Sequence, residues 1–422
     1  MKKVLFTAAH SGFSLNQVPL GGGAAVCEQL VREWGRTRPF ELKVLGPSVL
    51  GPIAPKDKDL VHYSELAYAR FCKDFERVLT GTILEEDPKS TVVLSNDVSE
   101  GPDFKRLGAR GYPVYTIYHV DVVDYFTTIY LRGRLSPERT TSIYRQIMRW
   151  GLSGLVPSIL KLVWDKQEAS VRYSRGLIVP SRRMKEVLLE CYPETSPRKI
   201  HVLPWGTWGN PVTTDDLRRE KAFLENHYPV LPNSWVLMTL SRLSPEKGQD
   251  RLLQALAQWE TRKDFPKEGI CLYIAGEGAF MMGKKFEQRL RHLAARLKRC
   301  RVHFIGHVTG ARKKALFQMA DLYVFPSRHE SYGLTLLEAL REGKPVLAMP
   351  SHGAEEVFKP EFGAMVPPGP EASAPDRLRE ALQRLLVDRS TLRRMGETAA
   401  AWAAGQDFSV TASRLAELVA SQ

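Results

Sequence analysis

A glycine-centred turn between two carboxylates is the feature of the sequence best suited to chemistry. Residues 326–338 read PSRHESYGLTLLE and follow the apolar run Leu322–Phe325, which predicts a buried strand. Gly333 allows a tight turn and a close approach of the backbone. The amides of Leu334 and Thr335 would then point outward from the start of a helix, an arrangement that binds anions. The pattern therefore predicts a phosphate cradle at the end of this strand.

Two carboxylates flank the predicted cradle. Glu330 lies in the loop ahead of the helix, and Glu338 lies in its first turns. Carboxylates accept hydrogen bonds from the hydroxyl groups of a ribose or another sugar. For Glu338 alone, a favourable interaction with the helix dipole is the better explanation. Together with the cradle, however, the pair predicts a ligand that combines phosphates with hydroxyl groups.

Two cations, Arg242 and Lys247, follow a second apolar run, Val236–Leu240. We expect a helix to begin here, with Ser244 as its cap and Pro245 in its first turn. Cations at a helix start oppose the helix dipole, so their presence favours a bound anion. Arginine offers a fork for phosphate oxygens and lysine a point charge. The sequence thus predicts a second group of phosphate ligands.

Short apolar strands alternate with longer amphipathic stretches, twice over, and would position these residues. The predicted strands are Val4–Ala8, Leu42–Leu45, Val92–Leu94, Val114–Tyr118, Leu177–Val179, Ile200–Leu203, Val236–Leu240, Leu272–Ala275, Val302–Ile305, Leu322–Phe325 and Val346–Ala348. Continuous apolar strands between helices predict parallel sheets covered on both faces. The stretch 205–233, with its glycines and prolines, is interpreted as a linker with flanking loops. The predicted fold class is α/β, with two doubly wound, Rossmann-like domains facing a central cleft.

Composition and length agree with an ordinary globular protein of two domains. The chain has 422 residues, of which 43% are hydrophobic and 25% charged, and it is long enough to fold without disulfides or structural metals. Its five cysteines are scattered and form no C-x-x-C pair, so we expect neither a disulfide framework nor a zinc site. The apolar run after Met1 is too short for a signal peptide or a membrane span. These features predict a cytoplasmic protein.

The charge balance points to acidic partners. The formal net charge is +13, which favours nucleotide phosphates, an anionic membrane surface or nucleic acid. The segment Phe126–Arg175 mixes arginines with aromatic and aliphatic residues. Such a mixture suits a helix at the inner face of a membrane, or a helix that packs its apolar face into its own domain. We favour the packed helix and keep the peripheral membrane contact as the alternative.

Residues 330–338 resemble the E-x7-E signature of the retaining, GT-B-fold glycosyltransferases of the glycosyl transferases group 1 family. Arg242–Gly248 resembles the family's R-x4-K element, Tyr273–Gly278 its G-x-G strand end, and Phe304–Val308 the segment on which the nucleotide base rests. Shorter resemblances lie at Pro19–Gly23, Gly343–Val346, Gly353–Glu356 and Phe408–Ser409. The match spans nearly the whole chain and is dense over residues 236–366.

The resemblance implies a GT-B fold and a metal-independent, retaining hexosyltransferase that needs no cofactor. Its donor would be a nucleotide-sugar, with UDP-sugars as the first expectation and GDP- or ADP-sugars next. Its acceptor would carry a hydroxyl group, as on a glycan, a lipid-linked sugar or a small molecule. The implied domains are 1–208 on the acceptor side, completed by a terminal helix 405–422, and 209–404 on the donor side.

The resemblance also assigns roles to individual residues. Arg242 and Lys247 would stabilise the leaving phosphate, while Glu330 would hold the sugar and Glu338 the ribose. His119, after the strand Val114–Tyr118, would contact the sugar; otherwise it is an ordinary polar residue at a strand end. The remaining donor ligands implied are Gly22, Gly23, Gly306, Val308, Gly333, Leu334 and Thr335. Asn96 and Asp97 would either meet the acceptor or simply form a turn.

Two other classes of protein stay open. A GT-B-fold sugar phosphorylase or a sugar-nucleotide epimerase would use the same residues, and an epimerase would turn over the donor without any acceptor. The alternative that is not an enzyme is a basic nucleic-acid-binding protein. Because no recognition helix or aromatic RNA platform is apparent in the sequence, we expect no nucleic-acid partner.

Overall fold

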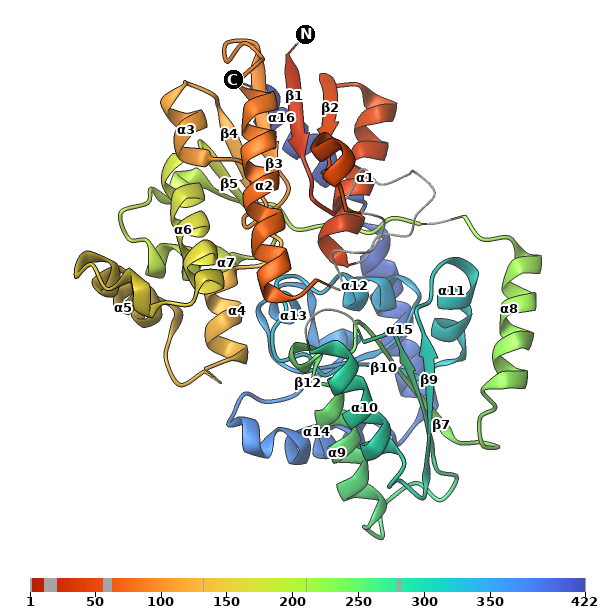
Figure 1. Ribbon diagram of the computed structural model, residues 1–422. Helices are drawn as coiled ribbons and strands as arrows, with labels where there is room; N and C mark the ends of the chain where they lie inside the picture. The colour runs from red at the N-terminus through yellow and green to blue at the C-terminus, as the bar shows by residue number, and fades with distance from the viewer. Residues whose placement is uncertain are drawn as a thin grey trace. The chain divides into compact units, whose positions relative to one another are not determined.

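The chain folds into two compact units. A computed structural model describes residues 2–10, 21–55, 63–131, 133–209, 211–278 and 282–421 (Figure 1). The first unit comprises Met1–Trp205 and Phe408–Gln422, and the second comprises Gly206–Asp407. The first division between them thus lies close to the 208/209 boundary expected from the sequence. Each unit contains one six-stranded sheet.

The first unit has a fully parallel sheet in the order β2-β1-β3-β4-β5-β6. The strands are β1 Lys3–Thr7, β2 Glu41–Leu45, β3 Thr91–Ser95, β4 Val114–Ile117, β5 Gly176–Val179 and β6 Ile200–Val202. The helices are α1 Gly22–Thr37, α2 Glu65–Ile83, α3 Phe104–Ala109, α4 Val122–Ile129, α5 Pro137–Arg149, α6 Ser158–Tyr173, α7 Arg182–Cys191 and α16 Phe408–Ala420.

Helices cover both faces of this first sheet. Successive side chains of a strand point to opposite faces, so an apolar strand needs packing partners on each side. Leu5 of β1 belongs to a core shared with Phe75 of α2 and Phe104 of α3. The next residue of β1, Phe6, points to the opposite face, where its ring lies 5.7 Å from that of Trp34 on α1. Strands buried in this way are apolar at successive positions, which is the pattern that predicted a parallel sheet.

The second unit repeats this plan with the order β12-β11-β10-β7-β8-β9, again fully parallel. The strands are β7 Trp235–Leu240, β8 Ile270–Ala275, β9 Cys300–Gly306, β10 Leu322–Phe325, β11 Val346–Ala348 and β12 Gly363–Met365. The helices are α8 Thr214–His227, α9 Gln249–Glu260, α10 Gly283–Ala294, α11 Gly310–Met319, α12 Leu334–Arg341, α13 His352–Val357, α14 Ala374–Leu385 and α15 Arg389–Ala404.

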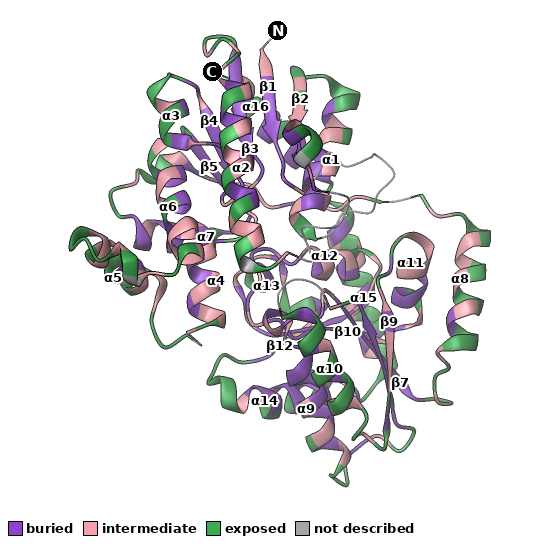
Figure 2. Cartoon of the chain, viewed as in Figure 1, coloured by how far each residue is buried: buried purple, intermediate pink, exposed green. Residues whose placement is uncertain are grey.

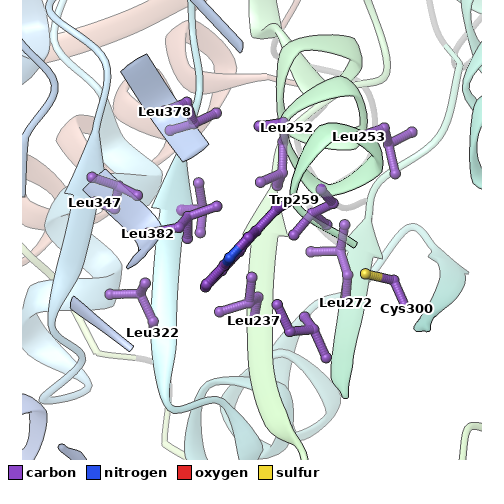
Figure 3. Packing of buried hydrophobic residues seen from close by; sticks show 14 of the residues in the cluster. Leu237, Leu252, Leu253, Trp259, Leu272, Cys300, Leu322, Leu347, Leu378 and Leu382 are labelled. Carbon is purple, nitrogen blue, oxygen red and sulfur yellow. The ribbon is translucent and has the colours of Figure 1, made fainter. Parts of the chain in front are cut away.

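One large core lies on one side of the second sheet. It joins Leu237 and Leu272 of the sheet to Trp259 of α9 and Leu382 of α14, all of them buried (Figure 3). Burying apolar side chains of this size is the main favourable term in folding. The core therefore fixes the strands whose carboxyl ends carry the predicted phosphate ligands.

All eleven predicted strands are present, with ends that differ by at most a few residues. Two elements were missed. Strand β12 is only three residues long and contains no apolar run. Helix α8 lies inside the stretch interpreted as a linker, so that interpretation was wrong. Its side chains are polar nearly all round, with Leu224 as its buried residue, so hydrophobic periodicity could not reveal it; a Thr213 cap begins it instead.

No helix in the described ranges combines the length and the apolar character needed to cross a bilayer.

The core of the second unit yields a test of stability. Replacement of Leu382 by alanine should lower the free energy of unfolding by about 2–5 kcal/mol, because it leaves a cavity among packed side chains. Val387, just beyond the same helix, is 76% exposed. Val387→Ala should therefore change the free energy of unfolding by less than about 0.5 kcal/mol. Urea denaturation followed by circular dichroism compares the two. Equal effects would contradict this account of the core.

Candidate functional site

The loop after β7 differs from the helix start expected from the sequence. Pro245–Lys247 forms a short 3-10 turn, and Gly248 adopts a left-handed conformation (φ 67°) before α9 begins at Gln249. The prediction that Ser244 caps a helix was wrong, because its hydroxyl donates to Glu246 Oε1 at 2.6 Å instead. The left-handed glycine delays the helix and leaves the preceding residues as a loop that is largely buried.

This loop is bonded to the loop that follows β10. A side-chain carbon at position 248 would lie 2.0 Å from the Pro326 carbonyl oxygen, so only glycine permits such a close approach. The Arg328 amide donates to the Glu246 carbonyl at 2.7 Å, and its guanidinium donates to the Pro245 carbonyl at 2.7 Å. The carboxyl ends of β7 and β10 are therefore fixed relative to each other.

Joining the loops brings together Lys247 and Glu330, two residues singled out separately in the sequence. Their side chains form a hydrogen-bonded ion pair and are each only 14% exposed. Arg242 lies close by, with Nη2 3.5 Å from Glu246 Oε1. Charges with so little access to water interact more strongly than they would at an open surface. The arrangement places two cations and two carboxylates, Glu330 and Glu246, at the carboxyl edge of one sheet.

Glu246, which sequence reasoning missed, lies beneath both cations. Burial would raise the pKa of its carboxyl group, but Arg242, Lys247 and the Ser244 hydroxyl hold that pKa below its usual value. The carboxylate is therefore ionised at neutral pH, and it partly neutralises the two cations. The available sequence signal was an acid placed directly between two predicted phosphate ligands.

The turn before α12 has the geometry that its sequence suggests. Gly333 is left-handed (φ 80°), and the amides of Leu336 and Leu337 donate to its carbonyl. For the amides of Leu334 and Thr335, the described part of the chain supplies no backbone acceptor. These two donors at the positive end of a helix form an anion-binding arrangement.

Glu338 of α12 is paired with a residue that sequence reasoning did not find. Lys313 of α11 places its ammonium 2.8 Å from Glu338 Oε1, and both side chains are partly exposed. Lys313 follows the β9 end, where Gly306 is left-handed with open space beside it and Val308 is buried. The sequence signal was a basic run at residues 312–314, but nothing in the run indicated which of its side chains would reach Glu338. The pair orients the Glu338 carboxylate toward α11.

The first unit holds a separate group around His119. Its ring Nε2 lies 3.0 Å from Asn96 Oδ1, and its ring stacks on Trp205 at 5.8 Å. A side-chain carbon at Gly23, on α1, would lie 3.1 Å from the same ring. Gly22, the first residue of α1, is exposed; Pro19 and Leu20 of the predicted glycine loop lie outside the described residues.

Burial lowers the pKa of His119 to about 4, and the positive charge of His10 adds to the effect. The ring is therefore neutral at physiological pH. Asn96 Nδ2 donates to Asp97 Oδ2 at 3.2 Å, which leaves its Oδ1 to accept a hydrogen bond from His119 Nε2. The single proton of the neutral ring therefore lies on Nε2, and Nδ1 is a hydrogen-bond acceptor.

Asp97 interacts with another acidic residue of the first unit, the buried Glu100. Burial and the nearby charge of Glu100 raise the pKa of Asp97. Glu100 has a lowered pKa: burial opposes its ionisation, but His10, 3.2 Å away, and the Tyr68 hydroxyl outweigh it. Glu100 and Tyr68 were not found in the sequence, because neither lies in a recognisable motif.

No group of three or more His, Cys, Asp or Glu residues in the described ranges has an arrangement that could hold a metal ion. The predicted site residues otherwise form two groups, one in each unit. The predicted cleft between the units stays a prediction.

Comparison with known proteins relates the second unit to one family. Residues 222–402 match the family model "Glycosyl transferases group 1". An uncharacterized glycosyltransferase of Methanocaldococcus jannaschii is 29% identical over 67% of this chain and 69% of its own length. A GDP-mannose-dependent alpha-(1-6)-phosphatidylinositol monomannoside mannosyltransferase of Mycobacterium tuberculosis is 32% identical over 49% of this chain. This chain spans 54%, or about half, of that second relative.

Solved structures agree on the fold. Sucrose-phosphate synthase from Thermosynechococcus elongatus superposes with a TM-score of 0.71 at 17% identity, covering 99% of this chain and 98% of the other. At this identity the likeness concerns the fold alone. The predicted α/β class with two Rossmann-like parallel sheets, the GT-B fold, is confirmed.

The His119 group yields a titration test. We expect the imidazole to titrate at a pKa of about 4. Because the unfolded chain binds that proton more readily, stability should fall as the pH drops from 6.5 towards 4. Asn96→Asp places a carboxylate beside Nε2 and should raise the pKa of the imidazole. NMR titration measures the imidazole pKa in the wild type and in Asn96→Asp, and His119→Gln assigns the signal. A wild-type pKa of 6.5, or no rise of the pKa in the variant, would refute the network.

Proposed function

Because residues 222–402 match the glycosyl transferases group 1 model, we propose that the chain is a member of this family and transfers a hexose from a nucleoside-diphosphate sugar to a hydroxyl acceptor with retention of anomeric configuration. The observation that carries this proposal is the joined pair of loops in the second unit. They place Arg242 and the Lys247–Glu330 pair at the carboxyl edge of one sheet. Ligands of open parallel sheets bind at that edge.

The proposed chemistry is stabilisation of a departing phosphate. Negative charge grows on the diphosphate as the bond from the sugar C1 to the phosphate oxygen breaks. Arg242, Lys247 and the amides of Leu334 and Thr335 would stabilise this charge with little reorganisation, because Glu330 already holds Lys247 and Glu246 lies 3.5 Å from Arg242. The acceptor oxygen would form its bond to C1 on the same face, and its proton would pass to the departing phosphate. No metal ion is needed in this scheme.

Glu330 and Glu338 would share the recognition of hydroxyl groups. Glu330 would hold the sugar or ease positive charge on its ring, and the Lys247 contact would hold that carboxylate ready. Glu338 would accept from the ribose, with one oxygen held by Lys313 and the other available. Gly306 and Val308 would support the base. In the first unit, the acceptor nitrogen of neutral His119 would bind a sugar hydroxyl, and the Gly22 and Gly23 amides would approach the phosphates.

The choice of donor and acceptor follows from the comparisons only as a proposal. UDP is the base first expected from the resemblance, whereas the mycobacterial relative is named for GDP-mannose. GDP-mannose and UDP-glucose are therefore the first two donors to test, followed by an ADP-sugar. The same relative acts on a phosphatidylinositol monomannoside, so we propose a lipid-linked acceptor, met at the cytoplasmic face of a membrane. Asn96 and Asp97 are the proposed acceptor ligands.

Donor binding tests the site. Arg242→Ala and Glu338→Gln should each weaken the best nucleotide-sugar about 10- to 100-fold, the loss expected for a hydrogen bond to a charged group. Lys313→Met should weaken it less, because it acts through Glu338. Isothermal titration calorimetry in metal-free buffer measures all three. Two exposed positions of the same unit, Arg393→Ala and Glu361→Gln, are the matched controls; equal affinity in site and control variants would refute the assignment.

Product analysis tests the reaction type. With the best donor and a hydroxyl acceptor, the new glycosidic bond should have the same anomeric configuration as the donor, read by proton NMR. The rate should not change with EDTA, because the cations and helix amides stabilise the leaving group. Inversion of the configuration, or loss of activity in EDTA that magnesium restores, would contradict the proposal. Turnover of the donor without any acceptor would favour an epimerase instead.

A further inference from the structure

Exposed apolar side chains concentrate around one helix of the first unit. Of the eleven large hydrophobic residues that are exposed in the described ranges, five lie between residues 130 and 152. They lie on α5 or beside it in the sequence; this helix packs on α4 and α7, and its exposed residues are green in Figure 2. Single exposed apolar residues are normal, but a concentration of them in so short a segment marks an interaction surface.

Helix α5 has two apolar faces, and only one is used inside the protein. On the inner face, Thr141 and Tyr144 are buried, and Met148 packs on the core that contains Trp164. This confirms the packed helix favoured from the sequence. It leaves unexplained a second row on the other side of the helix.

Ile143, Ile147 and Trp150 form the second row, which we call the outer strip. Their spacing of four and three residues places them on one side of a helix. Ile143 is 49% exposed and Trp150 65% exposed, and Ile147 between them is partly buried. Leu152, just beyond the helix, is exposed as well. A helix that only packed into its domain would carry polar residues at these positions.

The charges beside the outer strip are positive. Between residues 130 and 161 the sequence has Arg132, Arg134, Arg139, Arg145, Arg149 and Lys161 against the single acid Glu138. Arg145 is bound to Glu168 and Glu194, and Arg132 lies outside the described residues. Arg134, Arg139 and Arg149 are exposed, and within the described chain none of them forms a salt bridge. The apolar strip is thus bordered by cations available to an external anion.

We propose that the outer strip of α5 is a docking surface for an anionic lipid membrane. Ile143, Ile147 and Trp150 would enter the boundary between headgroups and acyl chains, and tryptophan is suited to that depth. Arg139 and Arg149 would contact anionic headgroups, each adding electrostatic attraction that falls with salt. The surface lies in the first unit, so it goes beyond the donor chemistry proposed for the second.

A lipid surface fits this strip better than a second copy of the chain. Two copies that met through the outer strip would bring Arg139 and Arg149 of each copy close together, and the local charge is repulsive for such a contact. Against an anionic surface, the same arginines are attractive. The strip is also short, as expected for shallow insertion rather than for a large protein interface.

Vesicle binding by the full chain tests the proposal. Co-sedimentation should show binding to vesicles that contain about 30% anionic phospholipid at low salt, and weaker binding to neutral vesicles or at high salt. Ile143→Ser combined with Trp150→Ser should reduce binding at least tenfold, and Arg139→Gln combined with Arg149→Gln should reduce it severalfold. Val387→Ser and Arg394→Gln, at exposed positions elsewhere, should leave binding unchanged.

A second measurement tests insertion directly. Brominated lipids should quench tryptophan fluorescence in the wild type, and Trp150→Phe should lose most of that quenching while it keeps binding. All variants should keep their nucleotide-sugar affinity, which separates this proposal from that of the donor site. Absence of vesicle binding, equal binding to neutral vesicles, or full binding by the serine variant would overturn it. Dimerisation that the serine variant abolishes, without vesicle binding, would identify a protein interface instead.

Discussion

The carbonyl oxygen of Pro326 occupies the space that a side chain at position 248 would need. This one close approach, with the hydrogen bonds from Arg328 to the neighbouring loop, joins the ends of two adjacent strands into a single structural element. The site of the second unit depends on it, because Lys247 comes from one loop and Glu330 from the other. Residues 83 positions apart in the chain thereby form one ion pair.

Buried polar groups have a similar role in both units, which is to fix the charge or hydrogen-bonding state of a neighbouring side chain before any ligand arrives. Glu246 stays ionised beside Arg242 and Lys247 and offsets part of their positive charge. Asn96 directs the protonation of His119, whose pKa burial lowers. Such preorganisation reduces the reorganisation that a reaction must otherwise drive. It also explains why the supporting residues are buried while the residues they support reach the sheet edges.

Sequence patterns predicted the strands well, because buried parallel strands are apolar at every position and short. The glycine turn and the cations at strand ends were found for the same reason, since each follows directly on a clear strand. Partners such as Glu246 and Lys313 were less accessible, because a pairing depends on which loops and helices become neighbours. Helix α8 was missed because it buries little, and Ser244 was misassigned because a contact of Gly248 with a distant carbonyl decides where α9 begins.

The last helix of the chain completes the first unit. Trp34 Nε1 donates to the Ala412 carbonyl, and Thr411 donates to the Pro204 carbonyl, while Phe408 stacks on Trp205. During synthesis, the amino-terminal sheet therefore emerges from the ribosome long before the helix that covers α1. The second unit, made of one continuous segment, can finish folding first, although it is made later. The first unit must wait for α16, and part of its apolar surface stays exposed to the chaperones of the cell until then.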